Sequence, residues 1–130
     1  MILDSSAIIA VLRTEPEAAD FARAIESAEK RHVSAVSYVE AAVVIDSGRS
    51  PVSSGRFDDF FRTSRVTIEA VTVQQAQIAR QAYRDFGKGR HKAGLNFGDC
   101  FAYALAKDLD EPLLFKGNDF RHTDVEVAKA

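Results

Sequence analysis

The stretch MILDSSAIIAVL, residues 1–12, decides the fold class of this chain. Three apolar residues, Met1 to Leu3, run directly into Asp4-Ser5-Ser6, and short polar side chains of this kind cap the first turn of a helix. The segment therefore predicts a buried strand that is followed by a helix over Ala7 to Leu12.

The same alternation of short strands and helices continues through the 130 residues. Connections long enough for β-α-β units predict a three-layer α/β/α fold with a short-stranded, mainly parallel central sheet, as one domain over residues 1–130. The predicted strands are 1–3, 32–35, 66–71, 112–115 and 125–127. The predicted helices are 7–12, one from Pro16 that ends at the charged residues 29–31, 36–45, one that carries Phe57, Phe60 and Phe61, 73–86 and 97–109.

Composition limits the classes of protein to consider. With 46% hydrophobic and 28% charged residues the chain is typical of a soluble globular domain, and the lone Cys100 is interpreted as a small buried hydrophobe. The longest apolar run, Val33 to Ile45, is too short for a bilayer and contains Glu40, and no basic leader precedes an apolar segment. We therefore expect a cytoplasmic protein with no membrane partner.

The net charge of −2 would not by itself attract nucleic acid, so any RNA binding must be local. One basic stretch is a candidate, with the alternative that it is the solvated C-terminus of a helix, where cations suit the helix dipole. Its residues are Arg80, Arg84, Lys88, Arg90, His91 and Lys92.

Four acids fall where a parallel fold can bring them together. Asp4 follows the first strand, Glu40 lies inside a helix, Asp99 lies in the first turn of another helix, and Asp119 follows a late strand. Because loops at the carboxyl ends of parallel strands converge on one crevice, this crevice is the expected functional site.

Each acid also has a structural explanation. Asp4 can cap the helix that follows it, Asp99 can complete a capping arrangement with Asn96, and Asp119 can be an ordinary turn residue. Glu40 shares its helix face with valines and has no cation one turn away, so the alternative for it is a salt bridge to a distant residue.

Converging carboxylates predict a bound metal ion. Two of them about 4 Å apart repel by about 1 kcal/mol in water and by about 4 kcal/mol at a protein surface, and a divalent cation removes this conflict. Hard oxygen ligands favour Mg²⁺, with Mn²⁺ as the alternative, over zinc, since the three histidines form no ligand pair at helical spacing.

Four blocks of the sequence, in this order and spacing, resemble the VapC-type PIN-domain toxins. The resemblance spans nearly the whole chain. The blocks are residues 2–7 (ILDSSA), Ser37-x-x-Glu40, residues 96–106 (NFGDCFAYALA) and residues 113–120 (LLFKGNDF).

This resemblance implies a ribonuclease of a toxin–antitoxin pair, in which Asp4, Glu40 and Asp99 bind the metal and Asp119 is the fourth catalytic acid. The last block departs from the family, which commonly has a Thr or Ser and an additional acid there, so Asn118 is the alternative to Asp119. Ser6 would orient the site by hydrogen bonding.

The predicted reaction is hydrolysis of an RNA phosphodiester by a metal-activated water. The resemblance also implies a homodimer and a VapB-type antitoxin, and an arginine of such a partner could pair with the acids and displace the metal. Its helix could occupy an apolar groove, with plain core packing as the alternative for these side chains. The residues concerned are Val11, Leu12, Phe57, Phe60 and Phe61.

Two other functions remain open. A receiver-like phosphoacceptor module would also carry aspartates, Mg²⁺ and a lysine such as Lys116. It fits poorly, because only Asp4 follows the first strand and Val66 to Val71 leads to no aspartate. A catalytically silent PIN scaffold that binds a partner is the second alternative, and the altered last block keeps it open.

Overall fold

A four-stranded, all-parallel sheet organises the protein, whose computed structural model describes residues 1–130. The strand order is β3-β2-β1-β4, so that β1 lies in the middle beside β2 and β4. The strands are β1 Ile2–Leu3, β2 His32–Ser34, β3 Thr67–Glu69 and β4 Leu113–Leu114.

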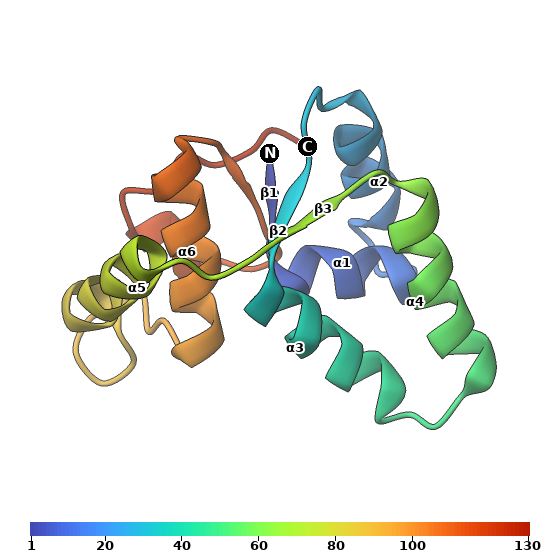
Figure 1. The fold of residues 1–130 in the computed structure, drawn as a ribbon, viewed down its shortest axis with the longest axis horizontal. Helices are drawn as coiled ribbons and strands as arrows, with labels where there is room; N and C mark the ends of the chain where they lie inside the picture. Colours follow the sequence, from blue (N-terminus) through green and yellow to red (C-terminus); the bar gives the residue numbers. More distant parts are fainter.

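Helices cover both faces of this sheet (Figure 1). On one face lie α1 Ser5–Leu12, α2 Ala18–Ser27, α3 Ala35–Asp46 and α4 Pro51–Thr63; on the other lie α5 Val73–Phe86 and α6 Phe97–Leu109. The predicted three-layer α/β/α architecture is confirmed. None of these helices is both long enough and apolar enough to span a bilayer.

The alternation of side chains along β1 and β4 creates two cores. Ile2 and Leu113 pack with α5 and α6, whereas Leu3 and Leu114 pack with the helices on the opposite face. All four side chains are essentially inaccessible to water. Strands covered on both faces show continuous apolar runs rather than a polar–apolar pattern, which is why residues 1–3 and 113–115 are recognisable in the sequence.

Apart from strand and helix ends that shift by one or two residues, the structure differs from the sequence prediction at three places. Helix α1 begins at Ser5, two residues early, because the Asp4 side chain already caps it there. Residues 125–127 form no strand but an isolated parallel bridge from Val127 to Leu113. The predicted turn at 117–119 leads into a 3-10 helix, η1, over Asp119–His122.

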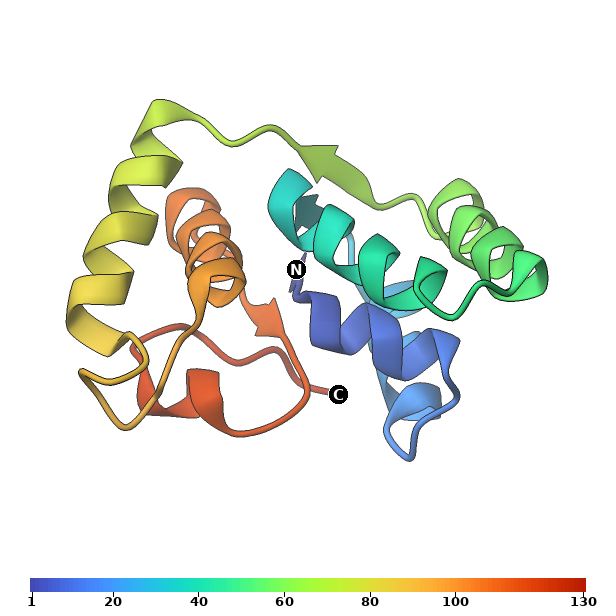
Figure 2. The same cartoon turned by 90° about the horizontal axis from the view of Figure 1, so that it is seen from below.

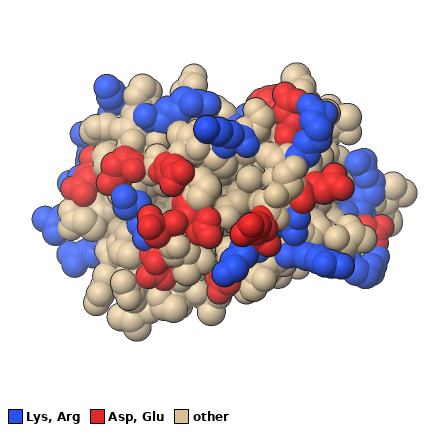
Figure 3. All heavy atoms as spheres, turned by 90° about the horizontal axis from the view of Figure 1, so that it is seen from above, with Lys and Arg blue, Asp and Glu red and all other residues tan.

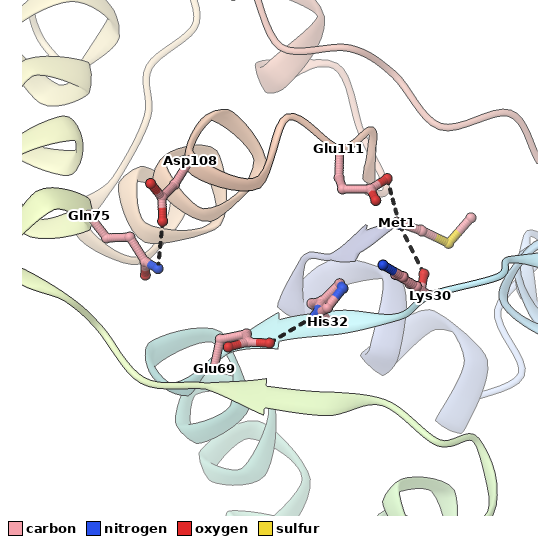
Figure 4. A network of polar contacts seen from close by, with 7 residues as sticks. All are labelled: Met1, Lys30, His32, Glu69, Gln75, Asp108 and Glu111. Carbon is pink, nitrogen blue, oxygen red and sulfur yellow. Dashed lines mark hydrogen bonds and ion pairs between the residues drawn. The ribbon is translucent and has the colours of Figure 1, made fainter.

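Polar groups of the sheet and of α5 and α6 are paired with one another (Figure 4). On the side of the molecule where β1 begins, acidic and basic side chains are interspersed over the surface (Figure 3). The links drawn in Figure 4 include the Met1 amino group to Glu111 at 3.2 Å, His32 to Glu69 at 2.9 Å and Gln75 to Asp108 at 3.1 Å.

Candidate active site

The carboxyl edge of the sheet is where α1, α3 and α6 place their first turns (Figure 2). Helix α1 follows β1 after one residue, and α3 follows β2 directly. Helix α6 packs against α3, so residues from three separate segments of the chain meet at this edge.

Asp4 lies in the middle of this edge and is only 3% exposed. Its backbone N–H donates to the Leu114 carbonyl at 2.9 Å, which extends the pairing of β1 with β4. Its Oδ2 accepts hydrogen bonds from the Ser6 N–H at 3.0 Å and from the Ser6 hydroxyl at 2.5 Å. Its Oδ1 is buried without any hydrogen-bond partner. The cap on α1 thus uses one carboxylate oxygen and leaves the other free.

Ser6 connects Asp4 to the loop after β4. While its hydroxyl donates to Asp4, the same oxygen accepts a hydrogen bond from the Lys116 N–H at 3.0 Å. Because the backbone donor occupies one lone pair, the hydroxyl proton is directed to the carboxylate. Ser6 therefore has the contacts that the predicted orienting role requires.

Glu40 reaches this edge from the second turn of α3. It forms no salt bridge with any Lys, Arg or His, so the alternative of a distant ion pair is wrong. Its carboxylate lies against the backbone of Gly98 in α6, since a Cβ added at Gly98 would meet three Glu40 atoms first and overlap them. Only glycine at position 98 leaves room for this carboxylate.

Asp99 caps α6 and faces the other acids as well. Asn96 and Asp99 form a reciprocal capping box, in which the Asn96 N–H donates to Asp99 Oδ2 at 3.0 Å and the Asp99 N–H donates to Asn96 Oδ1 at 2.8 Å. The structural explanation for Asp99 is therefore confirmed. As at Asp4, a cap and a place at the edge of the sheet coexist in one side chain.

The last of the four sequence blocks, residues 113–120, contributes exposed polar side chains to the site. Asp119 is the exposed first residue of η1, and its charge acts on Asp99. Asn118 is also exposed and makes no capping hydrogen bond through its side chain. The structure thus brings Asp4, Glu40 and Asp99 together and places Asp119 beside Asp99, at the rim.

The pKa values of the three inner acids are all raised. Burial raises the pKa of Asp4, against the opposing hydrogen bonds from Ser6. For Glu40, burial and then the charges of Asp4 and Asp99 raise the pKa from 4.5 to about 7. For Asp99, burial is again the main cause and raises the pKa from 3.8 to about 6, with the charges of Asp4 and Asp119 contributing. The three carboxylates are therefore electrostatic neighbours.

No basic side chain compensates this negative charge. The nearby Lys116 contributes its backbone N–H to the site, but its ammonium group pairs with Glu15 at 2.9 Å and Glu17 at 3.5 Å. Carboxylates that are buried together without a cation destabilise the fold unless they are protonated or bind a positive ligand. The chain itself therefore supplies no positive group that balances the carboxylates at this edge.

The donor set suits a hard divalent cation. Carboxylate oxygens without a His or Cys among them match Mg²⁺ and Mn²⁺, and the buried Asp4 Oδ1 has no partner in the protein. The side chains form no ready-made group of three or more His, Cys, Asp or Glu ligands around one point. Mg²⁺ commonly retains several waters and takes one or two carboxylates, so the arrangement fits an ion of this kind.

Two residues of this edge were missed by the sequence interpretation. Gly98 accommodates the Glu40 carboxylate, and the Ser5 hydroxyl opposes the rise in the Glu40 pKa. A glycine in the first turn of a helix is a signal that was available, because glycine weakens helices and its presence indicates a close approach. Ser5 carried no comparable signal.

Two further sequence interpretations are settled by burial. Cys100 is 3% exposed, and burial raises the pKa of its thiol to about 11, as expected of a small buried hydrophobe. Phe57 is 3% exposed and its ring packs at a tilt against those of Tyr38 and Phe61, so core packing explains it.

Comparison with known proteins gives a consistent result. The family described as PIN domain matches residues 1–126. Ribonuclease VapC28 of Mycobacterium tuberculosis is 54% identical over 129 residues, which cover 98% of this chain and 97% of that protein. Ribonuclease VapC of Mycolicibacterium smegmatis is 47% identical over 125 residues, covering 96% and 97%.

Solved structures share the fold at low sequence identity. The crystal structure of Mycobacterium tuberculosis VapC20, described as a Sarcin-Ricin loop cleaving toxin, superposes with a TM-score of 0.75 at 14% identity and covers 99% of this chain and 98% of that one. A toxin–antitoxin complex from Klebsiella pneumoniae superposes with a TM-score of 0.70 at 16% identity, over 95% and 92%.

Proposed function

Because this chain belongs to the PIN domain family, we propose that it is a metal-dependent endoribonuclease and the toxin of a type II toxin–antitoxin system. Its relatives of similar length, which are named VapC ribonucleases, support this proposal. The single observation that carries it is the group of three uncompensated carboxylates at the carboxyl edge, with the buried Asp4 Oδ1 left without a partner.

The proposed roles follow from the contacts. Asp4, Glu40 and Asp99 would hold one Mg²⁺ or Mn²⁺, and Asp119 would be the fourth catalytic acid at the rim, with Asn118 as the alternative. When bound, the ion would polarise the phosphoryl group, lower the pKa of a water and offset the repulsion between these acids and an RNA phosphate.

The chain's own contribution is to fix the geometry of its carboxylates. The Ser6 hydroxyl holds Asp4 Oδ2, the capping box holds Asp99 Oδ2, and Gly98 leaves room for Glu40. Asp4 and Asp99 are each held from one side by these hydrogen bonds, so their positions do not depend on the substrate. Hydrolysis by water should leave 5′-phosphate and 3′-hydroxyl ends, whereas attack by the RNA's own 2′-hydroxyl would leave cyclic phosphates.

We further propose a VapB-type antitoxin partner, a homodimer and a cytoplasmic location. The Klebsiella neighbour, which is described as a toxin–antitoxin complex, supports the first of these. An antitoxin arginine would silence the enzyme by pairing bidentately with the carboxylates and taking the place of the metal.

Cleavage of a structured RNA by the purified protein tests the proposal. The reaction is run with Mg²⁺ or Mn²⁺, with EDTA, and with the variants Asp4→Asn and Asp99→Asn. Asp58→Asn is the control, because it neutralises an exposed acid on α4. We expect metal-dependent cleavage that both site variants lose and the control keeps.

Other results of this assay would contradict the site, the mechanism or the function. Cleavage that survives both site variants overturns the site, and cyclic-phosphate ends overturn the mechanism. A protein that binds an antitoxin but cuts no RNA with either ion is the silent scaffold. Family membership argues against the receiver-like alternative, and a lack of labelling by acetyl phosphate would confirm this.

A further inference from the structure

Lys116 contacts the candidate site with its backbone but not with its charge. Its N–H donates to the Ser6 hydroxyl at 3.0 Å, and that hydroxyl donates to Asp4 Oδ2 at 2.5 Å. Its ammonium group forms salt bridges with Glu15 at 2.9 Å and Glu17 at 3.5 Å, and with none of the four site acids. A positive charge therefore starts from the edge of the uncompensated carboxylates and is paired elsewhere.

The two acids that pair with Lys116 lie on either side of Pro16, in the turn between α1 and α2. Thr14 follows α1 in the left-handed region, with φ at 54°, and the Glu15 N–H then donates to a carbonyl of α1 at 2.9 Å. Glu17 is the N-cap of α2, yet its side chain forms no capping hydrogen bond and pairs with Lys116 instead. The turn thus presents both carboxylates to one ammonium group.

Stability of the fold is a weak explanation for this pairing. The side chains of Lys116, Glu15 and Glu17 are 38%, 28% and 34% exposed. Ion pairs that are open to water in this way contribute little to the free energy of unfolding. A second acid does make departure of the ammonium group less frequent, because the loss of either contact leaves the other in place. The arrangement is therefore suited to holding the ammonium group at one position.

A free ammonium group at this place would be drawn to the site acids. Lysine carries three donors on a flexible four-carbon stem, and the buried Asp4 Oδ1 has no partner. Pairing with the carboxylates would balance their charge and occupy the oxygens that a hard divalent cation takes as ligands. Because the Lys116 backbone is itself bonded to the site, the ammonium group would compete at an effective concentration on the order of millimolar.

We propose that Glu15 and Glu17 keep the Lys116 ammonium group out of the carboxylate site, so that the site stays open to a divalent cation. The two glutamates are positioning residues, since they act through Lys116 and contact neither the ion nor the substrate. This inference rests on the proposed metal-dependent function. It adds to that function the residues that prevent the chain's own lysine from taking the place of the metal.

Binding of Mn²⁺ tests the inference without RNA, because free Mn²⁺ is measured directly by its electron paramagnetic resonance signal. The double variant Glu15→Gln/Glu17→Gln should bind Mn²⁺ about 10-fold more weakly, if the released ammonium group occupies the acids about nine-tenths of the time. Addition of Lys116→Met to the double variant should restore the affinity of the parent protein. Lys116→Met alone should not weaken binding, and it keeps the backbone N–H that contacts Ser6.

The comparison of the two backgrounds separates this inference from simpler explanations. If the glutamates only add negative charge near the site, Lys116→Met strengthens Mn²⁺ binding by the same factor in the parent and in the double variant, and equal factors overturn the inference. If they only support the fold, removal of Lys116 restores nothing, which also overturns it. Glu29→Gln/Asp58→Asn is the control for net charge, because it neutralises two exposed acids that form no salt bridge, and it should keep the parent affinity.

Carbodiimide coupling in EDTA reports the contacts of Lys116 without any metal. The reagent joins an amine to a neighbouring carboxylate as an amide, and mass spectrometry identifies the linked peptides. We expect Lys116 to couple to Glu15 or Glu17 in the parent protein and to a site acid in the double variant; a double variant without the second product overturns the inference. If the coupling shifts but the parent binds no Mn²⁺, the proposed function fails and the role of the glutamates in holding Lys116 stands. Binding of Mn²⁺ that Asp4→Asn abolishes, with no shift in coupling, gives the reverse.

Discussion

Replacement of Gly98 by alanine should inactivate the site without weakening the fold. The three atoms nearest to an added Cβ all belong to the Glu40 carboxylate, the flexible end of a long side chain. Glu40 can therefore swing away at little energetic cost. The helix gains an alanine in place of a glycine, so that its stability should stay the same or rise by up to about 1 kcal/mol.

The effect on catalysis should be much larger. To restore ordinary van der Waals contact the carboxylate must retreat by on the order of 1 Å or more, and such a displacement near reacting groups can reduce a rate on the order of 100-fold. Stability and activity should therefore change in different directions in a single variant.

Gly55→Ala is the matched control. Gly55 also lies in a helix, α4, and a Cβ there would meet nothing within 4 Å. The assay pairs thermal unfolding, followed by circular dichroism, with metal-dependent RNA cleavage. Full activity of Gly98→Ala, an equal loss in Gly55→Ala, or unfolding of Gly98→Ala would each refute the steric reasoning.

Two further predictions concern the charge of the site without metal. Asp4→Asn should raise the melting temperature in EDTA at neutral pH, because asparagine keeps the cap on α1 and removes a buried charge. A melting temperature lower than that of the control variant Asp58→Asn would contradict this prediction. Because the folded-state pKa values of Glu40 and Asp99 are raised to about 7 and about 6, the folded protein binds more protons than the unfolded chain, and stability should be lost as pH rises from about 4.5 to 7. In EDTA the melting temperature should fall over this range, less so in Glu40→Gln and not with saturating Mn²⁺; identical pH profiles of the parent and Glu40→Gln would show that Glu40 is not responsible.

Most of the fold was predictable because its strands are buried on both faces. Residues 1–3 and 113–115 are continuous apolar runs, which are easily recognised as buried strands. The capping residues Asp4 and Asn96 directly precede helices and so mark where these helices begin. The segment 125–127 was predicted as a strand from composition alone. It forms a single bridge to β4 because its pairing is limited to the hydrogen bonds around Leu113.

The candidate site was predictable in its acids but not in its support. Order along the chain placed Asp4, Glu40 and Asp99 at one edge, because parallel strands end on the same side. Contacts between distant segments could not be predicted from the sequence. Examples are the hydrogen bond from the Lys116 N–H to the Ser6 hydroxyl and the close approach of the Glu40 carboxylate to Gly98. Neither contact produces a recognisable residue pattern within a single helix or strand.

The double use of Asp4 and Asp99 as helix caps and as site acids has a genetic consequence. Aspartate and asparagine codons differ by a single base, and asparagine is as good a cap as aspartate. With the proposed roles of these two acids, one transition at either codon should therefore yield a folded, inactive chain that still presents its surface to an antitoxin. For the proposed growth-inhibiting ribonuclease, escape by point mutation is thus available at these two codons, and alleles of this kind should occur among populations released from antitoxin control.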